Sequence, residues 1–250
     1  MSRKYLGKRS KTIVFKDQFS ILDPIDRGIE ASKYNNLTPS NFGIDIWNAY
    51  EFSYLDKDLN PHLNVLEIII PSTSEKTIES KSMKLYLNSF YARSFKNKQH
   101  ILKIIEADLS NICNASVSVT FKKSFSKKPK SISLINSKLP FTESKNIYKF
   151  EAFRSLCPVT NQPDWAVIYL SFGSKVAIPW LVEYLSSFRE TGEFHELCID
   201  KIYSSIKNKF NLKKITVYGR FMRRGGIDIN PIRSSSSTTN KFNNHREFSQ

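Results

Sequence analysis

The order of expected strands and helices repeats once along the chain, and this repeat constrains the fold more than any other feature. Alternating apolar residues predict strands, and apolar residues three or four apart predict amphipathic helices. The first half is predicted to contain strands at 43–54 and 64–70, helices at 80–94 and 98–112, and strands near 115–122 and 131–136. The second half repeats this order at 147–156, 165–172, 179–189, 195–208, 213–222 and 227–232. The sequence therefore predicts an α+β protein built from two halves of one plan.

The repeat is also visible in the residues themselves. The segment 86–90 (YLNSF) corresponds to 184–188 (YLSSF) in the first helix of each half. The halves differ where polar chemistry would sit: Glu79 precedes that helix in the first half, whereas 176–179 reads Val-Ala-Ile-Pro in the second. Conversely, the pair His195-Glu196 opens the last helix of the second half and has no counterpart in the first. Because each half has polar residues that the other lacks, we expect a composite site to which both contribute.

Composition sets the expected domain boundaries. Of the 250 residues, 40% are hydrophobic, which is enough to bury a core in each half. We expect an extended N-terminal arm over 1–40, a first half over 41–140 and a second half over 141–233. The segment 234–250 is rich in Ser, Thr and Asn. It is expected to be disordered, because it has too few apolar residues to build a core.

Cysteine content, hydropathy and charge restrict where the protein works and what it binds. The three cysteines, Cys113, Cys157 and Cys198, form no CxxC pair, which favours a reducing compartment over a disulfide framework. No apolar run approaches the roughly 18 residues of a membrane span, and the basic N-terminus lacks the apolar segment of a signal peptide. We therefore expect a cytoplasmic, soluble protein. The formal charge of +15 raises the question of RNA, but much of the excess lies in 3–11 and 122–130, both expected termini or loops. No direct nucleic-acid contact is expected.

One tight loop carries a thiol at one end and a carboxyl at the other. It lies within Arg154–Trp165 (RSLCPVTNQPDW), between two expected strands. A nucleophilic cysteine needs a proton acceptor, because the thiolate is its reactive form, and an acid that protonates the substrate completes such chemistry. Cys157 and Asp164 are therefore the candidate nucleophile and acid, with a buried cysteine and a turn-capping aspartate as the structural alternative. Trp165 would either exclude water from Asp164 or pack in the core.

Three further segments carry polar groups suited to ligands. The strand-to-helix junction 79–82 (ESKS) offers backbone N–H groups, a lysine and two hydroxyls to a phosphate, or is an ordinary capped helix start. Glu79 is expected to point into the site. His195 is a candidate proton shuttle, and Glu196 could accept hydrogen bonds from an amino-purine edge. The loop 223–231 (RRGGIDINP) can bring guanidinium and backbone groups to a phosphate, or is a glycine turn with solvated arginines.

Together these segments resemble one family, the NADPH-dependent 7-cyano-7-deazaguanine reductases (QueF), in their longer form with two halves. The resemblance extends to about residue 233, and the order of the motifs makes it specific. One departure is Asn161, where the family usually has glycine; Asn tolerates a positive φ better than most residues, so little harm is expected. The matching segments are Leu6–Lys8, Glu79–Phe90, Cys157–Thr160, Gln162–Ala166, Phe194–Glu196 and Arg223–Pro231.

The resemblance implies a fold, a reaction and an assembly. The fold is the tunnelling fold (T-fold) in tandem copies, each an antiparallel β-sheet with two helices on one face. The reaction is reduction of the nitrile of 7-cyano-7-deazaguanine to the primary amine of 7-aminomethyl-7-deazaguanine, with two NADPH and without a metal, in queuosine biosynthesis for tRNA. The assembly is a homodimer.

The same resemblance implies residue roles. Cys157 would attack the nitrile carbon and form a covalent thioimide, Asp164 would be the general acid and base, and His195 would assist proton transfer. A protonated thioimide accepts hydride more readily than a nitrile, and an acid that begins protonated should be partly buried. Two glutamates would grip the deazaguanine base. The substrate-binding residues would be Ile78, Glu79, Ser80, His195 and Glu196, and the NADPH-binding residues Ser80, Lys81, Arg224 and Gly225.

Two alternative functions compete with this one. A zinc hydrolase on the same fold would need a Cys/His ligand set, for which Cys113, Cys157 and His195 are the plausible trio. A basic RNA-binding module would rest on the net charge and would bind tRNA in a salt-dependent way. Both leave the complementary differences between the halves unexplained.

Overall fold

The computed structural model describes residues 18–34, 37–237 and 242–250. The expected contributions of Leu6–Lys8 and of the basic segment 3–11 lie outside these described residues. The described chain confirms the predicted α+β class with two parts. In the described part of the chain, no helix is long and apolar enough to cross a membrane.

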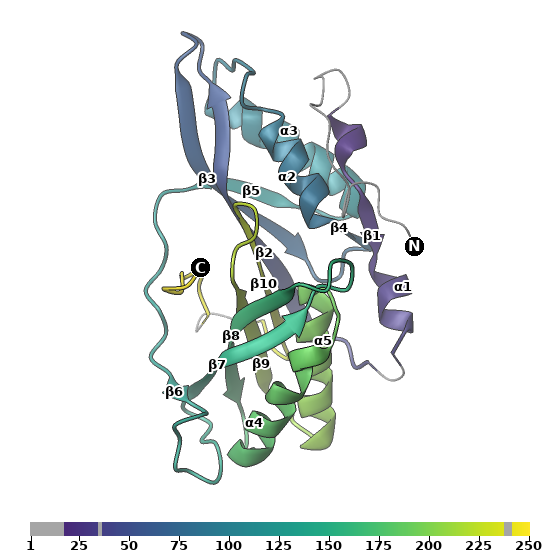
Figure 1. The fold of residues 1–250 in the computed structure, drawn as a ribbon, viewed down its shortest axis with the longest axis vertical. Coiled ribbons are helices and arrows are strands. Elements are labelled where there is room, and N and C mark those ends of the chain that lie inside the picture. The colour runs from purple at the N-terminus through teal and green to yellow at the C-terminus, as the bar shows by residue number, and fades with distance from the viewer. Residues whose placement is uncertain (1–17, 35–36, 238–241) are drawn as a thin grey trace. The chain divides into compact units, whose positions relative to one another are not determined.

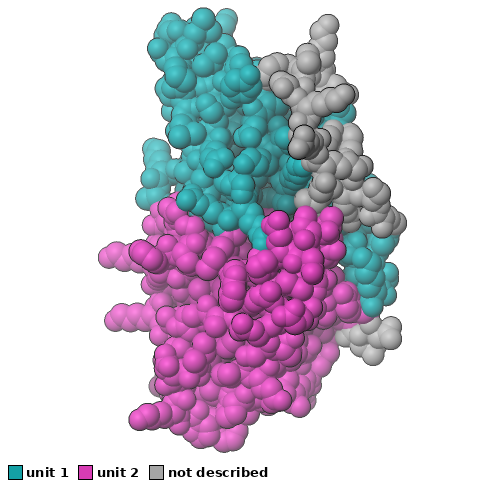
Figure 2. Space-filling view, viewed as in Figure 1, with its two compact units in different colours: residues 1–33, 46–124, 223–228 teal, residues 34–45, 125–222, 229–250 magenta. Residues whose placement is uncertain are grey.

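The chain divides into two compact units, whose boundaries differ from the expected 41–140 and 141–233. Strands β2 (Phe42–Leu55) and β10 (Ile227–Ser234) each contribute residues to both units. This division follows from strand pairing, which brings together segments that are far apart in the sequence. Unit 1 contains 1–33, 46–124 and 223–228, and unit 2 contains 34–45, 125–222 and 229–250 (Figure 2).

Unit 1 is built on the strand order β5-β3-β2, with β3 (Pro61–Pro71) antiparallel to β5 (Ser118–Lys122) (Figure 1). Alternate residues of β3 are buried, and α3 (Lys98–Cys113) buries Ile101, Ile105 and Leu109 at helical spacing. The remaining elements of the unit are η1 (Phe19–Ile21), β1 (Pro24–Asp26), α1 (Arg27–Ser32), β4 (Lys76–Ile78) and α2 (Ser80–Asn88), of which β1 and β4 pair as a small antiparallel sheet.

Unit 2 has the strand order β10-β9-β8-β7-β6. Helices α4 (Ile178–Ser186) and α5 (His195–Lys209), joined by η2 (Ser187–Glu190), cover one face of this sheet (Figure 1). Alternate residues of β8 from Ala166 to Phe172 form the core with Cys198, Ile199, Ile202 and Ile206 of α5. Its other strands are β6 (Ile132–Ser133), β7 (Ile147–Leu156), β8 (Pro163–Phe172) and β9 (Ile215–Phe221).

Strand β6 was expected in the first half, but it belongs to unit 2. It pairs in parallel with β7, with Ile132 opposite Tyr148, and the amide of Leu134 donates to the carbonyl of Lys149 at 2.9 Å. Those hydrogen bonds to β7 explain the difference, because neither the apolar pattern nor sequence proximity identifies the partner strand.

The internal repeat extends to local contacts. The hydroxyl of Ser89 donates to the carbonyl of Tyr86 at 2.6 Å, and that of Ser187 donates to the carbonyl of Tyr184 at 2.7 Å. The rings of Tyr86 and Phe90 meet edge to face at 5.4 Å, and the rings of Tyr184 and Phe188 do so at the same distance. The two aromatic-serine segments thus end their helices in the same way.

The C-terminal segment 242–250 is packed, contrary to the expectation that 234–250 is disordered; residues 238–241 lie outside the described part. Phe242 and His245 are buried against Tyr218 of β9, with ring centroids at 6.0 and 5.7 Å. The Gln250 amide group donates to the Phe221 carbonyl at 2.7 Å. Hydrogen bonds to the sheet, together with the packing of Phe242 on Tyr218, therefore hold this segment.

Candidate active site

The loop between β7 and β8 presents the candidate nucleophile. Leu156 and Pro163 are the last paired residues, and the loop 157–162 is closed by the Cys157 amide, which donates to the Gln162 carbonyl at 2.8 Å. Asn161 adopts φ 55°, as its tolerance for the left-handed region predicts. Cys157 is partly exposed as a residue and forms no disulfide.

The candidate acid lies at the start of β8, beside the loop that begins with Cys157. Asp164 is directly opposite Ser155 in the β7–β8 register, two residues before Cys157. Asp164 is 6% exposed, which confirms the predicted burial of this side chain.

His195 completes the group. It is the first residue of α5, and its ring stacks on Phe221 of β9 with centroids 4.0 Å apart and planes 10° from parallel. This stacking aims Nε2 at Asp164, 3.4 Å from Oδ2. The distance is at the long end for a hydrogen bond, as is common in sites without substrate. Two groups that can exchange a proton therefore lie beside the nucleophile loop.

Glu196 and Cys198 follow in the first turn of α5, and both are buried. Burial raises the pKa of the Cys198 thiol, and the nearby carboxylate of Glu193 raises it further. Cys198 thus stays a neutral thiol at physiological pH. The partly exposed Cys157 is the better placed of the two thiols for reaction.

Trp165 neither shields Asp164 nor packs in the core. Its side chain points to the opposite face of β8 and is 37% exposed. The guanidinium groups of Arg154 and Arg189 lie over its ring, at 5.9 and 6.0 Å from the centroid. The burial of Asp164 therefore comes from other neighbours.

The junction at the start of α2 differs from the expectation of free N–H groups. Glu79 is itself the helix cap: its Oε1 accepts from the Lys81 amide and its Oε2 from the Ser82 amide, both at 2.8 Å. The side chain therefore points along its own helix rather than away from it, and Ser80 is exposed. Ile78 is buried as the last residue of β4. A phosphate would not find these two amides free.

Arg224 and Gly225 lie in a tight turn that meets α2 within unit 1. The Arg224 amide donates to the Ile227 carbonyl at 2.8 Å, and Gly225 and Gly226 have φ of 57° and 81°. An added Cβ on Gly225 would lie 3.1 Å from Nζ of Lys84, on α2. Lys84 is one turn after Lys81, so both lysines lie on one side of the helix. Sequence reasoning missed Lys84, although its spacing from Lys81 was a signal.

Comparison with known proteins gives the same family for both parts of the chain. Residues 15–121 match the family model "Nitrile reductase, 7-cyano-7-deazaguanine-reductase N-term", and residues 163–240 match "QueF-like protein". A Coxiella burnetii protein named NADPH-dependent 7-cyano-7-deazaguanine reductase is 35% identical over 96% of this chain and 95% of its own length. The chain belongs to the 7-cyano-7-deazaguanine reductase family. Relatives of the same name from Acinetobacter baylyi and Desulfotalea psychrophila are 35% and 38% identical, over 86% and 77% of this chain and 88% and 78% of their own lengths.

The zinc alternative finds no ligand set among the described residues. No group of three His, Cys, Asp or Glu side chains there is arranged to hold a metal ion. Cys113, the proposed third ligand, is buried at the end of α3.

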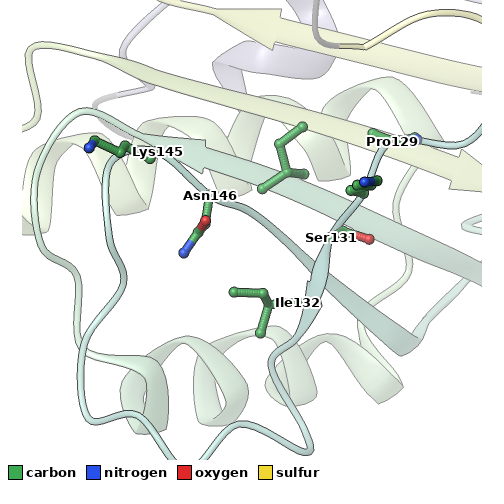
Figure 3. Close-up of a pocket in the computed structure, with 7 residues that line it drawn as sticks. Pro129, Ser131, Ile132, Lys145 and Asn146 are labelled. Atoms are coloured by element: carbon green, nitrogen blue, oxygen red, sulfur yellow. The ribbon is translucent and has the colours of Figure 1, made fainter.

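Unit 2 contains a cavity of about 550 Å³ (Figure 3). Its lining includes Lys130, Ile132, Lys145 and Asn146, next to the start of β7. Cys157 follows the other end of this strand of ten residues, roughly 30 Å away at the usual rise per residue. The cavity is therefore not the pocket of the reductase site.

Proposed function

We infer that this protein is an NADPH-dependent reductase that converts the nitrile of 7-cyano-7-deazaguanine to the aminomethyl group of 7-aminomethyl-7-deazaguanine in queuosine biosynthesis. The observation that carries this function is the Asp164–His195 pair beside the loop that begins with Cys157. Membership of the reductase family over nearly the whole chain supports it. Conversion of a nitrile to a primary amine takes two hydrides and two protons, so the site must deliver protons twice.

The first step is attack by the Cys157 sulfur on the nitrile carbon. A carbon–sulfur bond forms while the S–H bond and one carbon–nitrogen π bond break; the thiol proton passes to the Asp164–His195 pair and the nitrogen takes a proton from it, which gives a thioimide. The hairpin loop supports this role because Cys157 is partly exposed there, while the 2.8 Å hydrogen bond from the Cys157 amide to the Gln162 carbonyl keeps the loop closed.

Asp164 gives that proton to the nitrile nitrogen, and His195 assists the transfer. The two side chains are already 3.4 Å apart, and the ring of His195 is held by Phe221. The same pair can take up a proton and return it for the second reduction.

We propose that Glu196 and Glu79 accept hydrogen bonds from the amino and ring N–H groups of the deazaguanine base, with Ile78, Ser80 and His195 as further substrate contacts. Glu196 lies beside His195 in the first turn of α5. Glu79 can still accept further hydrogen bonds while it caps the helix, because a carboxylate has about four lone-pair sites. Among the described residues, its Oε2 accepts only the Ser82 amide.

Ser80, Lys81, Arg224 and Gly225 are proposed to hold NADPH, together with Lys84. NADPH supplies the hydrides for both reductions. Three cationic side chains from α2 and the adjacent turn suit its phosphate groups, and the glycine turn allows close backbone approach. We further propose a homodimer in the cytoplasm that contacts no nucleic acid. The three free cysteines support a reducing compartment, and the pairing of Lys122 with Glu67 and of Lys128 with Glu247 reduces the basic charge of loop 122–130.

Intact-protein mass spectrometry tests the proposed function. Wild type mixed with 7-cyano-7-deazaguanine and no cofactor should gain the mass of the nitrile, and NADPH should discharge the adduct. Cys157→Ala should gain nothing, whereas Cys198→Ala should still form the adduct. A folded wild-type protein that forms no adduct would remove the covalent mechanism.

A further inference from the structure

An ion pair between a buried carboxylate and a partly exposed ammonium group lies next to the candidate site and has no part in the chemistry above. Glu193, two residues before His195, is 3% exposed. Its Oε1 pairs with Nζ of Lys201, two turns along α5. The Lys201 ammonium also lies over the ring of Tyr34, 4.2 Å from the centroid. A buried carboxylate costs free energy unless it is paired, so its presence here requires an explanation.

The backbone of Glu193 is bound to the residue that precedes the nucleophile. The Glu193 amide donates to the Leu156 carbonyl at 3.0 Å, and the Leu156 amide donates to the Thr191 carbonyl at 2.8 Å. Leu156 is followed by Cys157. Glu193 therefore lies between the two reacting parts of the site, bonded through its backbone to the Cys157 side and through its side chain to the helix that carries His195.

We propose that Glu193 is a positioning residue for the reductase. Its ion pair with Lys201 fixes the position of His195, and therefore the contact between His195 and Asp164, relative to Cys157. Without the pair, the chain could enter α5 at another angle while both backbone bonds to Leu156 remain. A misplacement of about 1 Å in such a site can cost about 100-fold in rate. This inference rests on the proposed function, because its readout is the thioimide.

The test compares Glu193→Gln with the double variant Glu193→Gln/Lys201→Met. The rate constant of adduct formation is followed by time-resolved mass spectrometry at saturating 7-cyano-7-deazaguanine, and the substrate Kd and the urea midpoint are measured in parallel. We expect both variants to form the adduct about 10- to 100-fold more slowly, with Kd within about twofold of wild type. The double variant should unfold near the wild-type midpoint, because it leaves no unpaired buried charge.

Glu67→Gln is the matched control. Glu67 and Lys122 form another partly buried pair, 2.6 Å apart in unit 1, and they join β3 to β5. This variant should form the adduct at the wild-type rate. If the double variant regained both the wild-type rate of adduct formation and the wild-type stability, the Glu193–Lys201 pair would have only a structural role. If Glu193→Gln formed the adduct at the wild-type rate, the proposal would be overturned directly. In both cases the wild type still forms the adduct, so the proposed function stands; a wild type without adduct overturns both.

Discussion

Substitution of Gly226 by alanine tests the geometry of the turn that carries Arg224 and Gly225. Gly226 has φ 81°, and its carbonyl accepts from the Tyr50 amide at 2.8 Å, which ties the turn to β2. An alanine there meets two costs. An L-residue in the left-handed region costs about 1–2 kcal/mol. In addition, the new Cβ would lie 2.4 Å from Cδ of Glu51, so the Glu51 side chain must move.

The second cost is small, because the Glu51 side chain is 59% exposed and can rotate into solvent. Rotation would break its contact with Lys84, whose Nζ is 3.6 Å from Oε2, and an exposed pair of this kind contributes less than about 1 kcal/mol. Gly226→Ala should therefore destabilise the protein by about 1–3 kcal/mol, or about 2–4 °C in Tm for each kcal/mol.

Urea unfolding followed by circular dichroism measures this loss, and two further variants separate the costs. Gly226→Ala/Glu51→Ala removes the clash but keeps the strained φ, so it should recover the smaller part of the loss. Gly225→Ala should show the backbone cost alone, since its new Cβ would meet the flexible end of Lys84. A Gly226→Ala protein as stable as wild type, or a double variant less stable than the single one, would refute this account of the turn.

Two other predictions concern the acid and the C-terminal segment. Asp164→Asn keeps the shape of the acid but cannot donate its proton; mass spectrometry should show adduct formation slowed by about 100-fold or more at an unchanged urea midpoint, and an unimpaired rate would exclude Asp164 as the acid. Burial alone would raise the pKa of Glu247, but hydrogen bonds, first those from His245 and Lys128, outweigh it and lower the pKa to about 2. This stabilisation is present above the unfolded pKa near 4.3 and is lost as the pH falls toward 2. Glu247→Gln should therefore be less stable than wild type at pH 7, with a difference that shrinks below about pH 5 in urea titrations; a constant difference would contradict the pairing.

Most strands and helices followed from residue periodicity, because burial of one face imposes it directly. Strand β7 spans the predicted 147–156, and α3 spans 98–113 against the predicted 98–112. Among the helices, α2 departs furthest from its predicted end, since it ends at Asn88 rather than at 94. There the Ser89 hydroxyl donates a hydrogen bond to the Tyr86 carbonyl, and the Ser89 amide donates to the carbonyls of both Leu85 and Tyr86. These hydrogen bonds end the helix. A side chain that competes for backbone acceptors ends a helix without interrupting the apolar pattern.

The hairpin that places Cys157 and Asp164 at the two ends of one loop was predictable, because the two flanking strands and the short turn between them are visible in the sequence. The exposure of Trp165 was also predictable: neighbouring residues of a strand face opposite sides, so a buried Asp164 places Trp165 outside. The capping role of Glu79 was not, since a glutamate before a helix can turn toward its own amides or away from them. That choice depends on rotamer and packing, which spacing does not encode.

The packed C-terminal segment shows why composition alone gave the wrong expectation for 242–250. A polar segment cannot form its own core, but it can bind where a fold presents buried polar groups. Arg220 is such a group: it lies fully buried in β9, and its guanidinium donates to Gln250 Oε1 at 2.8 and 3.1 Å and to Asn244 Oδ1 at 3.0 Å. The signal was therefore in the strand rather than in the tail, because a buried arginine requires acceptors from elsewhere in the chain.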